Sequence, residues 1–218
     1  MAKPRALASP AARLDVSECV WEKGKAFHRV HRDEYEADQF NESGKGNARF
    51  SPISDAEGKV IPTLYGGGSY ACALMEVPFH DVPFETGLKT FDKGKLDSLV
   101  HSVVEPAKDL RLADLTNKPL RKLGIPRRDL IDSDKDQYPM TREWAKAIHA
   151  QCPDLQGLCW TSRQDDTQPA LMLFGDRIKP GSLMQIGDSR SLVDNADAYD
   201  ELLDVADLIG LGLVPGKS

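Results

Sequence analysis

A single carboxylate, Glu76, lies within the otherwise apolar run at 71–77, which reads ACALMEV. Three consecutive glycines at 66–68, preceded by Tyr65, come shortly before this run. An ionised carboxylate held at the boundary of a core and a cleft can stabilise positive charge that develops during a reaction, which is electrostatic rather than covalent catalysis. A short amphipathic helix also has a polar face, on which Glu76 would simply point outward. From the sequence, both interpretations of Glu76 stay open.

Two arginines could bind an anionic group. Arg29 belongs to the alternating segment AFHRVH at 26–31, and Arg49 is directly followed by Phe50, so either could project from a sheet into a cleft. The planar guanidinium suits phosphate oxygens better than the point charge of lysine. Arg32 is an alternative to Arg29, because the alternation could place it on the cleft side instead. The structural alternatives are an exposed strand face for Arg29 and an ion pair for Arg49.

Tyr65, Ser162 and Gly66 complete the candidate set. Tyr65 could stack on a planar ring while its hydroxyl meets a polar partner, although a strand-end tyrosine is at least as common in a core. Ser162 follows the apolar run at 157–161, so its hydroxyl could bond a ligand or help hold Glu76, or it could only open the next turn. Gly66 and the two glycines after it could let backbone donors approach a phosphate.

Histidine and cysteine residues show no metal-binding pattern. The five histidines contain no HExxH motif and the four cysteines contain no CxxC pair, so we expect no metal centre. His80 and Asp81 are adjacent in the sequence. Since neighbours on an extended chain point to opposite faces, we interpret this pair as part of a loop.

The elements that must position these residues follow from local patterns. Short apolar or alternating runs predict strands at 26–31, 60–65, 96–104, 110–112, 157–161, 170–174 and 183–186. Capping residues and helical spacing predict helices at 70–77 after Ser69, at 116–123 before Gly124, at 141–152 with Thr141 as the cap, and at 196–211. Because strands and helices do not alternate regularly, the predicted class is α+β, a compact mixed sheet with flanking helices.

The bulk composition favours one globular domain. The 218 residues are 40% hydrophobic and 28% charged, with no long Pro/Ser-rich linker. We expect 1–24 to be disordered or extended, with disorder at 1–13, a central domain at 25–190, and a C-terminal helix and tail at 191–218 that pack on the same domain. A C-terminal helix of this kind could also mediate a homo-oligomer, and the sequence does not choose between these roles.

Net charge and hydropathy argue against some classes of function. A formal net charge of −6 argues against a general nucleic-acid binder, which needs clustered cations. The basic residues at 121–128 are followed at once by aspartates at 129–136, so we interpret this stretch as a solvated loop of mixed sign. Without a signal-peptide core or an apolar run of about 18 residues, we expect a cytoplasmic protein that does not enter a membrane.

The order of the motifs resembles that of a known family. A strand with FHRV is followed by ARF at 48–50, LYGG at 64–67, ALMEV at 73–77 and, after a helix with Trp-Ala, GLCWTSR at 157–163. Together they resemble the RES domain, the toxin half of bacterial RES–Xre toxin–antitoxin pairs, over about residues 25–186. Two departures from the family pattern are Ala48, where a glycine is common, and the three glycines after Tyr65.

The resemblance implies a catalytic domain at 25–190 with a fold similar to the ADP-ribosyltransferase toxins. It further implies an enzyme that consumes NAD as its substrate, without another cofactor, by breaking the nicotinamide–ribose bond. The acceptor would be water, phosphate or a protein. Carried over by motif, the catalytic residues would be Glu76, Arg29 and Ser162, and the substrate-binding residues Arg49, Tyr65 and Gly66.

The resemblance also implies a separately encoded Xre-type antitoxin as partner, and we expect its contacts to cover the entrance of the cleft. Two other function classes stay open at this stage. One is a non-catalytic module of the same fold that binds a nucleotide or a partner. The other is a hydrolase that uses Ser162, for which the sequence offers neither a Gly-x-Ser-x-Gly motif nor a convincing adjacent base.

Overall fold

The computed structural model describes residues 8–216 of the chain. The strands are β1 (Glu18–Trp21), β2 (Phe27–Arg32), β3 (Ile53–Ser54), β4 (Val60–Ile61), β5 (Thr63–Gly67), β6 (Lys89–Asp92), β7 (Leu99–Pro106), β8 (Leu110–Asp114), β9 (Gly157–Thr161), β10 (Pro169–Phe174), β11 (Leu183–Ser191) and β12 (Leu211–Val214). The α-helices are α1 (Tyr70–Glu76), α2 (Asn117–Leu123), α3 (Arg127–Leu130), α4 (Tyr138–Gln151) and α5 (Ala196–Leu208). Three short 3₁₀ helices are η1 (Lys93–Leu96), η2 (Lys135–Gln137) and η3 (Gly175–Arg177).

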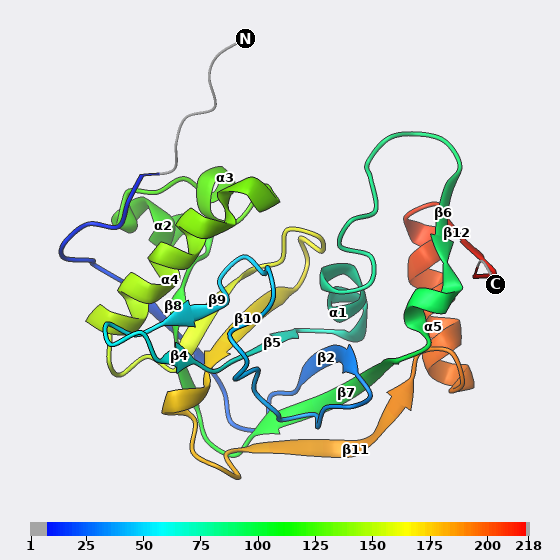
Figure 1. Cartoon of the computed structure of the whole chain (residues 1–218), viewed down its shortest axis with the longest axis horizontal. Helices are drawn as coiled ribbons and strands as arrows, with labels where there is room; N and C mark the ends of the chain where they lie inside the picture. Colours follow the sequence, from blue (N-terminus) through cyan, green and yellow to red (C-terminus); the bar gives the residue numbers. More distant parts are fainter. Residues whose placement is uncertain (1–7, 217–218) are drawn as a thin grey trace.

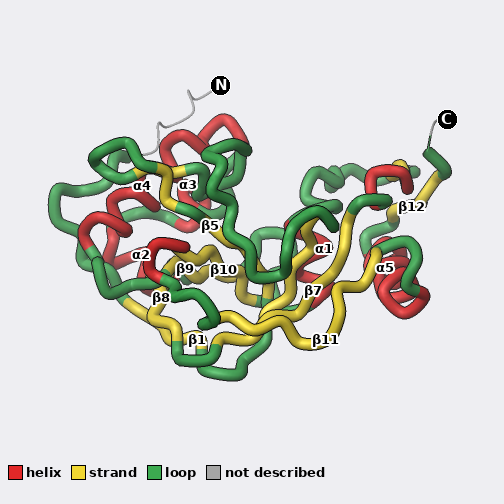
Figure 2. Tube along the Cα trace, turned by 60° about the horizontal axis from the view of Figure 1, so that its bottom comes forward, coloured by secondary structure: helices red, strands yellow, loops and turns green. Residues whose placement is uncertain are grey.

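Eight strands form one curled mixed sheet in the order β1-β8-β9-β10-β5-β2-β7-β11 (Figure 2). Only the β8–β9 pair is parallel within this sheet; its other pairs are antiparallel. Helices α2, α3 and α4 gather at the end of the sheet that holds β8 and β9, whereas α1 and α5 lie toward β7 and β11 (Figure 1). The predicted α+β class, with a mixed sheet and flanking helices, is therefore confirmed.

Two apolar clusters anchor the helices to opposite halves of the sheet. One joins Trp144 and Ile148 of α4 to Trp160 and Phe174 of the sheet, with Phe50 between them. The other joins α1 to α5 and to β2; its buried members include Tyr70, Leu74, Val30, Ala198 and Leu202. Each half of the sheet thus has its own layer of helices, while a third cluster, which includes Phe27, Leu64 and Leu171, packs the strands of both halves together.

Helix α1 begins where the sequence predicts. Ser69 is its N-cap and accepts a hydrogen bond from the Cys72 N–H at 3.0 Å. Helix α2 also ends as predicted, at Gly124, whose φ of 72° is the left-handed conformation that glycine adopts without strain. Local capping rules therefore place the start of α1, the helix that brings Glu76 to the sheet, and the end of α2.

Several boundary predictions are wrong. Strand β11 runs on to Ser191 instead of ending at 186, and the predicted strand at 60–65 is divided at Pro62 into β4 and β5. Helix α4 begins at Tyr138, and Thr141 lies inside its first turns, where the hydroxyl bonds the Tyr138 carbonyl at 3.1 Å and the Arg49 carbonyl instead of capping. The predicted helix at 196–211 ends at Leu208 because Gly210 turns the chain at φ 66° into strand β12. Strand β7 starts only at Leu99.

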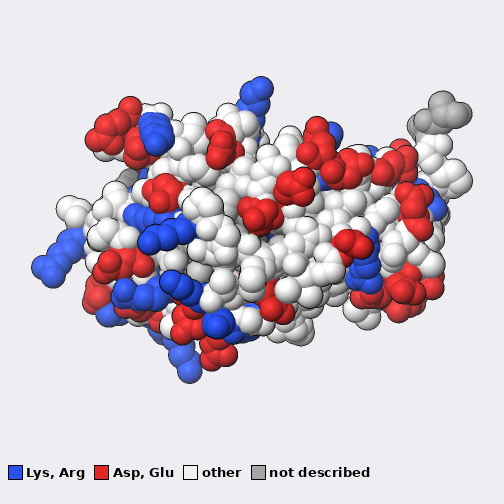
Figure 3. All heavy atoms as spheres, turned by 90° about the horizontal axis from the view of Figure 1, so that it is seen from below, with Lys and Arg blue, Asp and Glu red and all other residues white. Residues whose placement is uncertain are grey.

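The first residues that the structure describes pack on the sheet and on α4. Residues 1–7, part of the segment predicted to be disordered, lie outside the described residues. Trp144 Nε1 donates to the Ala8 carbonyl at 2.9 Å, and β1 pairs with β8 from Glu18↔Ala113 to Trp21↔Leu110. At the end of the molecule where α5 lies, acidic side chains gather on the surface (Figure 3).

Among residues 8–216, no helix combines the length and the apolar character needed to cross a bilayer.

The middle of the sheet has a weak junction. Strand β5 pairs with β10 over five residue pairs, and β2 pairs with β7 over six. Between β2 and β5, the register holds a single pair, His28↔Gly67. The two strands part beyond this pair, and the surfaces between them become available to a ligand.

A chain of polar side chains, with the buried His101 in its middle, crosses the sheet beside this junction. His28 Nδ1 lies 2.9 Å from His101 Nε2, and Arg190 Nη2 lies 2.9 Å from His101 Nδ1. Arg190 Nη1 then donates to Glu201 of α5 at 3.1 Å. His101 is only 1% exposed; this burial, together with electrostatic interactions with the His28, Arg190 and His31 side chains, lowers its pKa to about 3. His101 is therefore neutral in the folded protein at physiological pH.

We expect this neutral histidine to make folding pH-dependent. Because the folded pKa of His101 lies below the unfolded value of about 6.5, the unfolded chain binds more protons between the two, and stability is lost as the pH falls below about 6.5. From pH 7.5 to 5, His101 should lower the free energy of unfolding by about 1 to 2 kcal/mol. Urea titrations of the wild type and of His101→Gln should give a smaller pH dependence for the variant; equal dependence would contradict the assignment.

Candidate functional site

A cleft of about 1560 Å³ opens where β2 and β5 part. Its walls come from β2, β5, the loop at 39–49, helix α1, and residues 80–81 and 135–138. Five of the six residues predicted for the site line it, namely Arg29, Arg49, Tyr65, Gly66 and Glu76. A cleft of this size exceeds the volume of about 300–1,000 Å³ that is usual for one small ligand, so it can take an extended molecule.

The sixth predicted residue, Ser162, reaches the cleft through Glu76. The Ser162 hydroxyl donates to Glu76 Oε1 at 2.6 Å. The same hydroxyl accepts hydrogen bonds from the backbone N–H groups of Gln164 at 3.0 Å and Asp165 at 2.9 Å. Its proton and both lone pairs are therefore engaged, which disfavours Ser162 as a nucleophile and makes it a support for the carboxylate.

Glu76 is held from two elements that are distant in the sequence. It is the last residue of α1, and Ser162 directly follows β9. One turn earlier in α1, burial raises the pKa of the Cys72 thiol to about 12, with the negative charge of Glu76 adding to this effect. Cys72 is thus an inert packing residue, and Glu76 is the carboxylate that α1 brings to the cleft.

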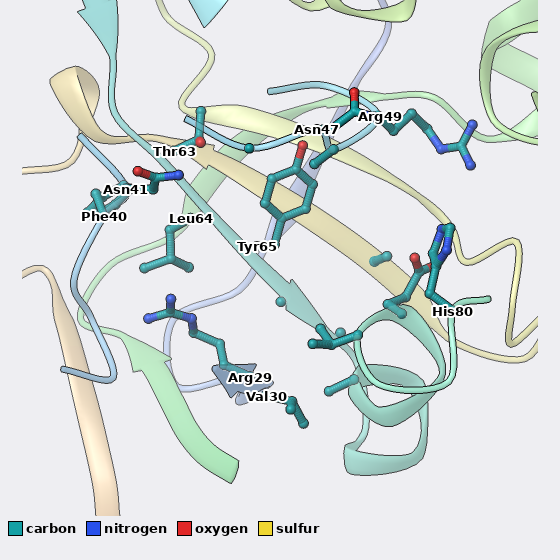
Figure 4. Close-up of a pocket in the computed structure, with 18 of the residues that line it drawn as sticks. Arg29, Val30, Phe40, Asn41, Asn47, Arg49, Thr63, Leu64, Tyr65 and His80 are labelled. Carbon is teal, nitrogen blue, oxygen red and sulfur yellow. The ribbon is translucent and has the colours of Figure 1, made fainter. Parts of the chain in front are cut away.

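Arg49 faces Glu76 from the opposite wall. Only 8% of Arg49 is exposed; its Nη1 donates to the Ser133 carbonyl at 3.0 Å and to the Ser133 hydroxyl at 2.8 Å. The guanidinium lies over the Tyr138 ring, 5.0 Å from its centroid. Burial lowers the pKa of Arg49, while Tyr138 and Glu76 act in the opposite direction. Within residues 8–216, hydrogen bonds use Nη1 alone, which leaves Nε and Nη2 for an anion in the cleft (Figure 4).

The backbone of Arg49 is fixed by α4. The Thr141 hydroxyl donates to the Arg49 carbonyl, and Arg142 Nε donates to the Ala48 carbonyl at 3.1 Å. Both donors come from the first half of α4, about 90 residues further along the chain. Helix α4 therefore positions the arginine from one side of the cleft.

Arg29 has a different environment from Arg49. Its guanidinium donates to the backbone carbonyls of Glu36 at 3.3 Å, Gln39 at 3.4 Å and Ala37. Burial lowers its pKa to about 10. Both terminal nitrogens are thus used to hold the loop at 36–39, which continues into the wall of the cleft.

The alternative arginine, Arg32, is more exposed than Arg29. Its side chain is 64% exposed and lies 3.6 Å from Glu34 in a surface ion pair. Both arginines line the cleft, and Figure 4 shows Arg29 beside Leu64 on the lower side of it. Of the two, Arg29 is the one fixed in position by the protein.

Tyr65 is a structural part of the cleft wall. Its hydroxyl accepts the Phe50 N–H at 3.1 Å, and its ring meets Trp160 edge-on, with centroids 6.4 Å apart. Burial raises the pKa of Tyr65 to about 12. The hydroxyl therefore stays protonated and fixes the residue that follows Arg49.

The glycines after Tyr65 allow close packing. A Cβ at Gly66 would come within 2.5 Å of the Phe27 ring, and one at Gly67 within 2.9 Å of Cys72 Sγ. The Gly68 N–H donates to the Pro169 carbonyl at 2.7 Å and is not free for a phosphate. Gly66 thus contributes to the cleft by letting β5 lie against the core.

The sequence did not predict the part of the cleft wall that is formed by residues 80–81 and 135–138. His80 Nδ1 lies 2.8 Å from Asp81 Oδ1, Lys135 Nζ lies 2.6 Å from Asp81 Oδ2, and the Tyr138 hydroxyl lies 3.4 Å from His80 Nε2. All four residues line the cleft. The signals were present as an adjacent His–Asp pair and a mixed-charge stretch, but both also fit an ordinary surface loop. Among residues 8–216, no cluster of three or more His, Cys, Asp or Glu side chains could hold a metal ion.

The family model described as the RES domain matches residues 26–194. The chain belongs to the RES domain family. The matched part of this RES domain contains every predicted site residue and both strands that border the cleft, whereas α5 and β12 lie beyond it. No curated protein matches the chain.

We expect Tyr65→Phe to destabilise this RES domain by about 1 to 2 kcal/mol, because the buried Phe50 N–H would lose its acceptor. Tyr138→Phe is the matched control, since its hydroxyl makes only a long contact of 3.4 Å with His80. Chemical denaturation of the three proteins measures the difference. A Tyr65→Phe variant as stable as the wild type would show that the hydroxyl does not hold the Arg49–Phe50 segment.

Proposed function

We propose that this RES domain cleaves the nicotinamide–ribose bond of NAD and acts as the toxin of a toxin–antitoxin pair. The observation that carries the proposal is Glu76, a carboxylate oriented by Ser162 at 2.6 Å inside a cleft that also presents Arg49. Membership of the RES family, which is associated with NAD-related toxins, supports the same activity.

The chemistry asks for the kind of group that Glu76 provides. Nicotinamide leaves as a neutral molecule, so the reaction needs little acid assistance. The barrier lies in the positive charge that develops at C1′ of the ribose, and a preorganised carboxylate stabilises this charge. Ser162 engages Oε1 of Glu76, so Oε2 is the oxygen available to the ribose, either to face C1′ or to accept a hydrogen bond from a sugar hydroxyl.

Binding of the dinucleotide falls to the walls of the cleft. Arg49 has Nε and Nη2 free for the pyrophosphate within the described residues, and a guanidinium is well suited to it. Arg29 supports the reaction indirectly, because it holds the loop at 36–39 through backbone carbonyls. Tyr65 and Gly66 shape the wall beside Glu76. NAD is the substrate in this proposal, no further cofactor is needed, and the acceptor is water, phosphate or a protein.

An Xre-type antitoxin is the proposed partner. Contacts of that partner over the cleft entrance would block NAD, and they would do so in the cytoplasm, where both proteins and the substrate would meet. The acidic end of the molecule at α5 suits a partner that carries basic residues (Figure 3). A complex that cleaves NAD as fast as the free toxin would contradict this mode of inhibition. A homo-oligomer through α5 and an ADP-ribosyltransferase-like fold are further parts of the proposal.

We expect Glu76→Gln to lower nicotinamide release by about 100-fold or more, because glutamine keeps the size and hydrogen bonds of the side chain but loses the charge that stabilises the transition state. Glu85→Gln, an exposed acid in the loop after α1, is the matched control and should leave the rate unchanged. Nicotinamide release from NAD by the purified proteins, with and without phosphate, is the measurement.

The outcome of this measurement also identifies the class of function. Phosphate-dependent release would identify phosphate as the acceptor, and label transferred from NAD to a protein would identify a protein acceptor. If the wild type releases no nicotinamide and labels no protein, the enzymatic proposal fails and the protein is a binding module of the same fold. A Glu76→Gln variant with wild-type activity would remove the carboxylate from the mechanism.

A further inference from the structure

His28 lies at the junction that opens the cleft, and none of the roles described so far uses it. It forms the single register pair between β2 and β5, opposite Gly67, and it is one of the residues that line the cleft. A Cβ at Gly67 would be 3.2 Å from the Ala73 backbone nitrogen, so His28 sits beside α1. Ala73 also lines the cleft and precedes Glu76 by one helical turn. His28 is therefore at the Glu76 end of the cleft.

The hydrogen-bond chain behind His28 determines which ring nitrogen carries its proton. A guanidinium can only donate, so His101 Nδ1 accepts from Arg190 at 2.9 Å. The proton of neutral His101 is then on Nε2, which donates to His28 Nδ1 at 2.9 Å. Because His28 Nδ1 is an acceptor, the proton of neutral His28 is on Nε2. Glu201 completes the chain by accepting from Arg190 at 3.1 Å.

The Nε2–H group of His28 is open to the cleft. No hydrogen bond within residues 8–216 involves this nitrogen, and no buried side-chain nitrogen or oxygen of that part of the chain lacks a partner. It follows that His28 Nε2 is accessible, and the cleft is the space that His28 lines. The imidazole is also held in place, because its ring is parallel to that of His101 within 1° and Tyr70 stacks on His101 with centroids 4.0 Å apart.

We propose that His28 is a further substrate-binding residue, whose Nε2–H donates to an uncharged oxygen at the nicotinamide–ribose end of NAD and whose tautomer is set by Arg190 through His101. The identity of the ligand rests on the proposed function. Burial, followed by the nearby charge of Arg190, lowers the pKa of His28, so the group is a neutral single donor. Such a donor suits an amide carbonyl or a sugar hydroxyl, whereas the charged Arg49 on the other wall suits the pyrophosphate.

Two substitutions of His28 distinguish a hydrogen-bond donor at the position of Nε2 from a side chain that only fills space. Glutamine at 28 can place its amide nitrogen near the position of Nε2, whereas asparagine places it near Nδ1 and leaves the Nε2 position empty. In a Glu76→Gln background, where NAD is not consumed, His28→Asn should weaken NAD binding about tenfold, the scale of one neutral hydrogen bond. His28→Gln should stay within about threefold of its parent. Calorimetric dissociation constants and a thermal melt of each protein are the measurements.

The results distinguish this proposal from the function on which it rests. A Glu76→Gln parent that does not bind NAD overturns both. A parent that binds NAD, with Asn and Gln variants that bind equally well or equally poorly while remaining folded, overturns the role of His28 alone. ADP-ribose, which lacks the nicotinamide, identifies the oxygen: a loss seen only with NAD indicates the carboxamide, and a loss with both ligands indicates the ribose.

The tautomer can be measured without any ligand. Ring ¹⁵N chemical shifts distinguish a protonated from an unprotonated histidine nitrogen, and we expect His28 in the free protein to carry its proton on Nε2. Arg190→Lys, which keeps a donor for His101, should preserve this state, whereas Arg190→Met should allow the other tautomer. A wild-type His28 protonated on Nδ1 would overturn the proposal whatever the result of the binding experiments.

Discussion

The separation of β2 from β5 is the constraint on which the site depends. A sheet strand normally satisfies its backbone groups along both edges, yet these two strands share the single pair His28↔Gly67. The glycine makes the junction close, since any side chain there would meet Cys72 at the start of α1. Beyond the junction, the two halves of the sheet follow their own packed layers of helices. A further apolar cluster, which includes Phe27, Leu64 and Leu171, still joins the two halves, so the sheet stays continuous while the cleft opens between β2 and β5.

Polar contacts between distant parts of the chain hold the two sides of this opening. Arg29 binds carbonyls of the loop at 36–39 on the β2 side. On the other side, Ser133 and Thr141 fix Arg49 at its side chain and at its backbone. A buried guanidinium is costly unless it is hydrogen-bonded, so each arginine must be satisfied by the protein or by a ligand. Arg29 is satisfied by the protein, and Arg49 only in part.

The parts that could be predicted are those set by local chemistry. The cap at Ser69 and the glycines before it place α1, and hence Glu76, because helix ends are determined by a few neighbouring residues. The class of fold follows from the mixture of apolar runs. The order of motifs was enough to name the RES family, whose model covers the same residues.

The rest depended on contacts that leave no local pattern. Ser162 was expected either to open a turn or to hold Glu76, and only the fold brings the two together across 86 positions. The partners of Arg29 are backbone carbonyls, which any residue can supply, so the sequence could not separate a loop-holding arginine from a phosphate-binding one. Thr141 looked like a helix cap because threonine favours that position, but its hydroxyl has a second acceptor, the Arg49 carbonyl.

The two walls of the cleft differ in charge, and this difference favours one orientation of a dinucleotide bound between them. The wall at β2 presents a neutral imidazole whose proton is ordered by Arg190, since that guanidinium is turned away from the cleft toward His101 and Glu201. The wall at α4 presents the charge of Arg49, whose pKa is lowered by burial and raised in part by Tyr138 and Glu76. A dinucleotide carries its negative charge in the pyrophosphate and its uncharged oxygens at the ends. If NAD is the substrate, as we propose, the lowest electrostatic cost has the pyrophosphate at Arg49 and the nicotinamide ribose beside Glu76, where the carboxylate would face the carbon that becomes positive.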